Sequence, residues 1–185
     1  VNKVMERFTR LIKYHYSFLP YAYSLCFENA LYGRPLMRAV NYYDAQNQAL
    51  ADVDDQFLWG RNILVAPVVT PENHRSVIFP EAGTVWVDMN DPAKKYEGGT
   101  SIDIDVPLNV LPHYARGGSV LPRYADTDFT STKDIDCNKL SLTYYYVGDN
   151  TPSSATDLYD DDHKSTTTIE DDNYQLTHIS SEAVP

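Results

Sequence analysis

The sequence predicts a mainly β protein in which an antiparallel β-sandwich follows a helical segment. From residue 62 onward, short runs rich in apolar residues are separated by turn residues such as Gly, Pro, Asn and Asp, which is typical of a sandwich. Apolar and acidic residues alternate strictly over Ile102–Val106, as in a strand with one buried and one wetted side. The N-terminal segment instead shows helical spacing and leads into a short, mostly buried strand over Pro35–Val40, the order of a parallel α/β layer.

The helical segment is predicted by apolar residues that recur three and four positions apart over Val4–Leu19, with polar residues on the other side. Pro20 lies inside this pattern. It should kink the helix or begin a second one, because proline lacks a backbone donor and its ring clashes with the preceding turn. The second helix, Tyr21–Leu31, should end at Gly33–Pro35, where a glycine is followed by a proline.

The elements after residue 50 are predicted from turn residues and alternation. Asp54 is a candidate N-cap for a short helix over Asp55–Trp59 that Gly60 closes. A polar segment between Arg123 and Asn138 should be a linker or long loop. The predicted strands are Asn62–Val68, Ser76–Phe79, Thr84–Asp88, Ser101–Val106, His113–Ala115, Ser119–Leu121, Leu140–Val147 and one near Tyr174–Ile179.

The composition argues against several classes of partner and site. The formal net charge is −11, and no cluster of Lys and Arg interrupts it, so nucleic acid and acidic membrane surfaces would be repelled. Charge or proline breaks every long apolar run, so no membrane insertion is predicted. Cys26 and Cys137 lie too far apart for a close-spaced metal site or a disulfide framework. The start lacks a signal-peptide pattern and an initiator methionine, which suggests processing or a cut-out piece. No cofactor and no metal are expected.

A family resemblance is carried by a series of runs from Tyr14 to Pro122. In order they read YHYSFLPYAYSL, GRPLMRAV, DDQFLWGRNILVAPV, RSVIFPEAGTVWVD, YEGG and PLNVLPHYARGGSVLP. This series closely resembles the C-terminal portion of glycoside hydrolase family 31, the α-glucosidase and α-xylosidase family. The tail, DLYDDDHKSTTTIEDDNYQL, resembles the opening of that family's second C-terminal β domain.

The resemblance implies an architecture for the whole chain. In the family a (β/α)8 barrel carries the active site, and two β-sandwich domains follow it. Residues 1–60 would be the last helix and strand of the barrel, 61–125 the proximal C-terminal β-sandwich, 126–138 a linker or loop, and 139–185 the beginning of the distal β domain.

Two short runs resemble the family's catalytic motifs but occur in the wrong place. VWVDMNDP over Val85–Pro92 and VGDN over Val147–Asn150 contain the candidate acids Asp88 and Asp149. In the family both catalytic runs precede the helix that carries the LPYxY pattern, and here both follow it. Asp91 also stands where the nucleophile run has glutamate. The two candidate acids should lie in separate sandwiches, whereas a retaining glycosidase holds its carboxyl groups about 5 to 5.5 Å apart. The resemblance therefore implies turn or strand-end roles for them, and a core position for Trp86.

Three other groups have a functional and a simpler interpretation. Arg38, near the carboxyl end of its strand, could support an active site, and neutralising nearby carboxylates is simpler. Arg116–Ser119 could form an anion-binding nest, and a turn between strands is simpler. Asp160–His163 suggests a calcium or zinc site but lacks the ligand spacing of either, which favours a solvated charged turn. The five histidines form no Ser/His/Asp arrangement.

We therefore predict a C-terminal fragment of a retaining α-glycosidase that acts on α-linked glucosyl or xylosyl oligosaccharides. The fragment should contain no catalytic residue and be inactive alone, and the apolar side of its first helix should favour self-association. A carbohydrate-binding or scaffolding β module, and a fragment of a transglycosylase from the same family, are alternatives. The family's common use favours a periplasmic or extracellular location.

Overall fold

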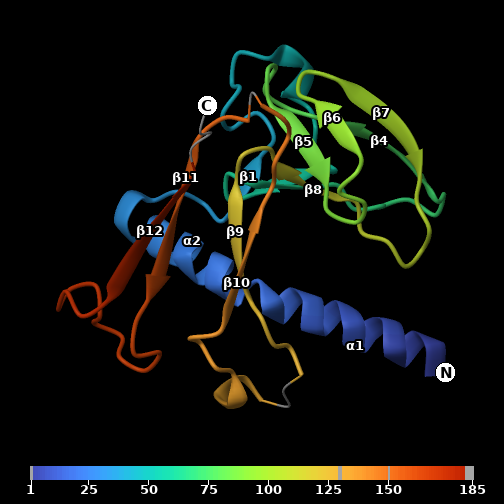
Figure 1. Ribbon diagram of the computed structural model, residues 1–185. Coiled ribbons are helices and arrows are strands. Elements are labelled where there is room, and N and C mark those ends of the chain that lie inside the picture. The colour runs from blue at the N-terminus through green and yellow to red at the C-terminus, as the bar shows by residue number, and fades with distance from the viewer. Residues whose placement is uncertain (1, 129–130, 150, 182–185) are drawn as a thin grey trace. The chain divides into compact units, whose positions relative to one another are not determined.

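The computed structural model describes residues 2–128, 131–149 and 151–181 of the chain, and it confirms a mainly β protein (Figure 1). Contacts divide the chain into two compact units. Unit 1 draws on residues within 1–34, 120–144 and 154–181, and unit 2 on residues within 35–119 and 145–153. The units interleave along the sequence, and the four consecutive segments predicted above stay a prediction. None of the described helices combines the length and the apolar character that a membrane crossing requires.

Two helices begin the chain, as predicted. They are α1 (Asn2–Ser17) and α2 (Leu19–Tyr32). Pro20 falls in the first turn of α2, where the missing backbone donor has no intrahelical partner to lose. Gly33 ends α2 with φ 65°, and its N–H donates to Asn29 O at 2.8 Å. The left-handed conformation explains why a glycine stands at this position.

Besides the two helices, unit 1 contains four strands that form two pairs. They are β9 (Val120–Tyr124), β10 (Leu140–Tyr144), β11 (Ser154–Asp160) and β12 (Gln175–Ser181). The pairs β9–β10 and β11–β12 are antiparallel. The predicted linker therefore connects two neighbouring strands, and its described part contains a 3-10 turn over Thr132–Asp134.

Hydrogen bonds and ring contacts join α2 to β11 within unit 1. The backbone N–H of Tyr159 donates to Ser24 Oγ at 3.0 Å, and the rings of Tyr159 and Phe27 stack with centroids 4.3 Å apart. The Asp161 carboxylate accepts hydrogen bonds from Tyr23 at 2.7 Å and Tyr159 at 2.6 Å. Only 2% of the Asp161 side chain is exposed. Because a buried carboxylate needs such partners, Asp161 fixes the helix and the strand to one another.

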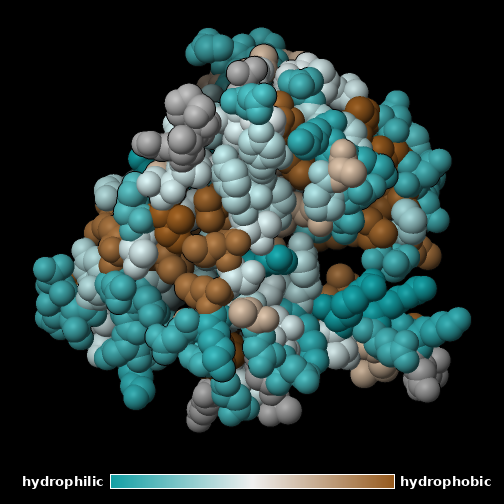
Figure 2. Space-filling view, in the orientation of Figure 1, coloured by the Kyte–Doolittle hydropathy of each residue, from teal (hydrophilic) through white to brown (hydrophobic). Residues whose placement is uncertain are grey.

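The first helix turns its polar side toward its own unit. Tyr14, Lys13 and Arg10 line a groove between α1 and β9, together with Arg123. Most of the apolar side faces away, and the exposed fractions are 69% for Val4, 58% for Phe8, 45% for Leu11 and 39% for Ile12. Met5 is 57% exposed and borders the groove. Figure 2 shows a largely hydrophilic surface on the side of α1 that faces the viewer, and hydrophobic residues gathered around α2, β11 and β12. The amphipathic pattern predicted the helix correctly, but unit 1 does not cover its apolar stripe.

Unit 2 contains two antiparallel sheets. The larger has the order β1-β2-β3-β8-β5-β6, and the smaller pairs β4 with β7. The strands are β1 (Met37–Ala39), β2 (Phe57–Trp59), β3 (Ile63–Val65), β4 (His74–Ile78), β5 (Val85–Asp88), β6 (Lys95–Glu97), β7 (Ser101–Asp105) and β8 (His113–Arg116), with a 3-10 turn at Gln48–Leu50.

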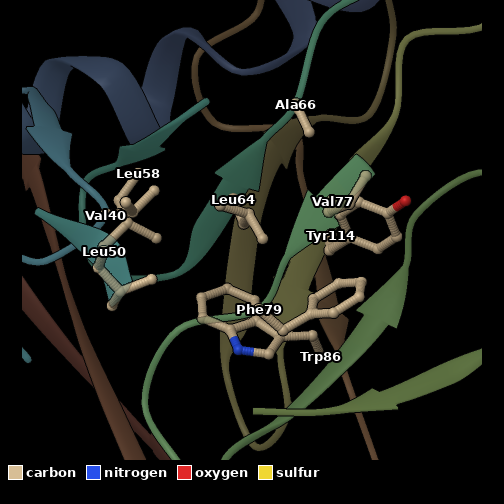
Figure 3. Close-up of a cluster of buried hydrophobic side chains, with 9 residues drawn as sticks. All are labelled: Val40, Leu50, Leu58, Leu64, Ala66, Val77, Phe79, Trp86 and Tyr114. Atoms are coloured by element: carbon tan, nitrogen blue, oxygen red, sulfur yellow. The ribbon is translucent and has the colours of Figure 1, made fainter. Parts of the chain in front are cut away.

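Side chains from both sheets and the adjoining loops fill one core (Figure 3). Trp86 is 0% exposed, and its indole N–H donates to Pro80 O at 3.1 Å. The Phe79 ring lies 4.8 Å from Tyr96 and 4.9 Å from Tyr114, in stacked and edge-on contacts respectively. The cluster comprises Val40, Leu50, Leu58, Leu64, Ala66, Val77, Phe79, Trp86 and Tyr114. The core position predicted for Trp86 is thus observed.

Two local predictions were wrong. Residues Phe57–Trp59 form β2 instead of a short helix, because they pair with β1 on one side and β3 on the other. Gly60 still breaks the element, with φ 62°, but it does so between two strands. Strand β1 is also less buried than predicted: Arg38 is the buried residue of its three. Tertiary pairing outweighed the local pattern in both cases.

The Gly98-Gly99 pair allows β6 and its turn to pass close to the loop before β5. A Cβ added at Gly98 would lie 2.0 Å from Glu81 O, closer than real contacts allow. The Gly98 N–H also donates to Thr84 O at 2.6 Å, so the chain has little room to move. Gly99 has φ 81°, a conformation that favours glycine.

We expect Gly98→Ala to lower the free energy of unfolding by about 3 kcal/mol or more, because the backbone near Glu81 must shift. The control is Gly83→Ala. Gly83 has φ 85° but nothing within 4 Å of its added Cβ, so the loss should be about 1 kcal/mol. Urea denaturation of both variants measures the difference, and equal losses would contradict the close approach at Gly98.

We expect Asp161→Ala to lower the free energy of unfolding by about 3 kcal/mol, because the hydroxyls of the half-buried Tyr23 and the buried Tyr159 lose the acceptor that they share. Asp157→Ala is the matched control. Asp157 pairs with His178 at 2.7 Å, but their side chains are 60% and 64% exposed, so its loss should stay below about 1 kcal/mol. Denaturant titrations in which the two variants lose the same stability would exclude a fixing role for Asp161.

Candidate functional site

Asp88 ends β5 and holds the turn that follows. Its Oδ1 accepts hydrogen bonds from the backbone N–H of Asn90 at 2.8 Å and of Asp91 at 3.3 Å. A side-chain acceptor of this kind is typical of an Asx turn. The strand-end role predicted for Asp88 is therefore observed, and the absence of a catalytic role stays a prediction.

Asp149 lies in a turn after β10, as predicted, where its Oδ1 accepts a hydrogen bond from the Tyr146 hydroxyl at 3.0 Å. Contacts group residues within 145–153 with unit 2, which also contains Asp88, and the placement of the two acids in separate sandwiches stays a prediction. The turn adjoins the other end of β5, since Val147 lies against Gly117, whose N–H donates to Val85 O. Val85 and Asp88 are separated by roughly 10 Å of strand. Asp88 and Asp149 therefore lie at opposite ends of β5 and do not face each other across one pocket.

Arg38 and the turn after β8 have structural contacts. Arg38 is 2% exposed, donates from Nε to Pro35 O at 2.8 Å and from Nη1 to the Tyr43 hydroxyl, and lies against the rings of Tyr42 and Tyr43. Its partners thus include a carbonyl, a hydroxyl and two rings. In the Arg116–Ser119 segment, the Ser119 N–H donates to Arg116 O at 3.1 Å, and the predicted turn is confirmed.

The acidic run at Asp160–His163 is only partly the solvated turn that was predicted. Asp162 is exposed, and hydrogen bonds from the side chain and backbone of Ser165, and from the Lys164 N–H, lower its pKa to about 2. Asp161 is buried. Burial by itself raises the pKa of Asp161, but hydrogen bonds from Tyr159, Tyr23, the His163 N–H and Thr168 lower it below the ordinary value. Within residues 2–128, 131–149 and 151–181, no group of three or more His, Cys, Asp or Glu side chains could hold a metal ion.

A cavity of about 260 Å³ lies in unit 2 beside the end of β5. The register of β5 and β8 sets Asp88 directly opposite Tyr114, so their side chains share one side of the sheet. Burial raises the pKa of Tyr114, and the nearby charge of Asp88 raises it further, which keeps the phenol protonated at neutral pH. The lining residues are Asp88, Asn90, Lys94, Tyr96, Ile104, Asp105, Val106, Pro107, Val110, Pro112 and Tyr114.

The cavity was not predicted from the sequence. There Asp88 stood as an isolated acid, and Tyr114 and Lys94 had no predicted role. A signal existed in the predicted strands Thr84–Asp88 and His113–Ala115, but their pairing and register were needed to set Asp88 opposite Tyr114. Register depends on partners distant in the chain, so the local pattern could not supply it.

Comparisons by sequence and by structure lead to the same family. Residues 33–121 match the glycosyl hydrolase family 31 C-terminal domain. Glucoamylase 1 of Candida albicans is 34% identical over 164 residues, which are 88% of this chain and 17% of that protein. The α-xylosidase of Saccharolobus solfataricus is 30% identical over 161 residues, 87% of this chain and 21% of that protein.

Among solved structures, a family 31 dextranase of Flavobacterium johnsoniae, complexed with glucose, matches with a TM-score of 0.80 and 30% identity. The match covers 93% of this chain and 21% of the dextranase chain. The chain thus spans 17 to 21% of the length of these three relatives. It belongs to glycoside hydrolase family 31, of which it carries the C-terminal domain region.

Proposed function

We propose that the chain is the C-terminal region of a retaining α-glycosidase that acts on α-linked glucosyl or xylosyl oligosaccharides, and that its own role is structural or accessory. The observation that carries the proposal is the match of residues 33–121 to the family's C-terminal domain. The relatives named above are a glucoamylase, an α-xylosidase and a dextranase, and the chain spans about a fifth of each.

The catalytic carboxyl pair belongs, in this proposal, to a part of the protein outside this chain. The positions of Asp88 and Asp149 support it. Both are engaged in turns, at opposite ends of β5, whereas a retaining mechanism uses two carboxyl groups about 5 to 5.5 Å apart.

The outward apolar side of α1 supports the same proposal. A helix normally buries its apolar stripe against the core, but here the polar side lines the groove with β9, and Phe8 and Leu11 are exposed. We propose that residues 1–60 contain the last helix and strand of a (β/α)8 barrel. Residues 61–125 are then the proximal sandwich, 126–138 a linker or loop, and 139–185 the beginning of the distal β domain. The stripe of α1 then packs on the rest of the barrel.

The purified chain should not hydrolyse an aryl α-glucoside or an aryl α-xyloside above the buffer rate, because the proposed catalytic carboxyl pair lies outside this chain. Chromogenic assays of the wild type, Asp88→Asn and Asp149→Asn should be indistinguishable. Turnover that Asp88→Asn abolishes would overturn the accessory role and make β5 the nucleophile strand.

The chain should associate with itself as its concentration rises, because the stripe of α1 exposes a contiguous apolar surface. Phe8→Glu should weaken association at least about tenfold by placing a charge on the stripe. Thr9→Glu makes the same change of charge on the polar side, where Thr9 lines the groove, and should leave association unchanged. Sedimentation velocity measures all three proteins, and a wild type that stays monomeric throughout would refute the prediction.

A further inference from the structure

The cavity beside Asp88 combines buried polar groups with apolar walls. Tyr114 is 2% exposed, and among the described residues no hydrogen bond is found for its hydroxyl. The one fully enclosed side-chain N or O atom without a hydrogen bond in the described residues is Arg75 Nη2, so the Tyr114 hydroxyl opens onto the cavity that it lines. In Figure 3 this oxygen points away from the other labelled side chains. A protonated phenol thus presents a donor and an acceptor inside the cavity.

Other polar atoms converge on the same space. Asp88 uses Oδ1 for its turn, which leaves Oδ2 without a hydrogen bond from any described residue. Asn90 donates from Nδ2 to Leu111 O at 2.9 Å, so its carbonyl oxygen is oriented as an acceptor. Lys94 supplies an ammonium group that forms an ion pair with Asp91 at 3.4 Å. The lining therefore contains both hydrogen-bond acceptors and hydrogen-bond donors.

Apart from Asp105, which pairs with His74 at 3.0 Å, the remaining walls are apolar or aromatic. The Tyr96 ring, held by stacking on Phe79 at 4.8 Å, is joined in the lining by Ile104, Val106 and Val110. Such surfaces suit the C–H bonds of a ligand, whereas a wholly apolar ligand would leave the Asp88 and Tyr114 oxygens unpaired at a cost in free energy.

The chemistry of the lining excludes other ligand classes. A phosphate or carboxylate would meet the charge of Asp88, and Lys94 is already paired with Asp91. A metal ion would require a ligand group that the described residues do not form. The volume of about 260 Å³ is below the range of about 300 to 1,000 Å³ that drug-sized ligands occupy, so a single ring fits better than a chain of rings. Neutral hydroxyl groups around a small ring satisfy every condition.

We propose that this cavity is a sugar-binding subsite that takes one neutral pyranose ring. Tyr114 and Asp88 hydrogen-bond to its hydroxyl groups, and Tyr96 contacts its C–H surface. The assignment of a pyranose follows from the cavity. That the ring is the terminal residue of an α-linked oligosaccharide rests on the proposed function. Such a subsite adds a substrate-holding role to the C-terminal region.

The test is a titration of the isotope-labelled 185-residue chain with methyl α-glucoside, followed by amide chemical shifts. We expect saturable shifts at Asn90, Lys94 and Val106, with dissociation constants in the millimolar range. Tyr114→Phe removes only the hydroxyl and should weaken binding about fivefold. Asp88→Asn keeps an oxygen for the turn but loses the charged acceptor, and should weaken binding about tenfold or more.

Asp103→Asn is the control, because Asp103 is exposed on β7 and does not line the cavity. It should bind the sugar as the wild type does. The amide spectrum away from the cavity shows whether each variant is folded. If either Tyr114→Phe or Asp88→Asn fails to fold, the other variant still tests the proposal. The proposal is overturned by unmoved amides at the cavity, by unchanged affinity in both variants, or by saturable shifts at these amides with phosphate or calcium. None of these outcomes affects the proposed function, which the hydrolysis assays test separately.

Discussion

Antiparallel pairing of β5 with β8 is the constraint on which unit 2 depends. The register sets Trp86 opposite Arg116 and Asp88 opposite Tyr114. Residues two apart on a strand share one side, so the pairing that buries Trp86 also puts Asp88 and Tyr114 at the cavity. A slip of one residue would turn all of these side chains to the other side of the sheet. The same strand pair thus contributes Trp86 to the core and Asp88 and Tyr114 to the cavity.

Unit 1 is organised differently, around a buried carboxylate. Asp161 connects α2 to β11 through Tyr23 and Tyr159, and the stacked rings of Phe27 and Tyr159 seal the contact. A carboxylate with several donors retains its charge when enclosed. An acidic run that looks solvated in the sequence therefore supplies a buried carboxylate to this unit.

Helix α1 has an unusual orientation within unit 1. Its polar side lines a groove with β9, and its apolar stripe is exposed. This inversion of the ordinary amphipathic arrangement agrees with a chain that spans only 17 to 21% of the length of its relatives. The exposed apolar side of α1 and the turns held by Asp88 and Asp149 are the observations that support the proposed accessory role.

The sequence alone determined the features that depend on neighbours in the chain. Helical spacing and Pro20 predicted both helices, and alternation predicted most strands, because periodicity and turn residues act locally. The resemblance of the ordered runs from Tyr14 to Pro122 indicated the family. Tertiary structure decided what depends on distant partners. Pairing made Phe57–Trp59 a strand, packing buried Asp161, and the β5–β8 register created the cavity at Tyr114. Strand register and burial are set by contacts across the fold, which no local pattern contains.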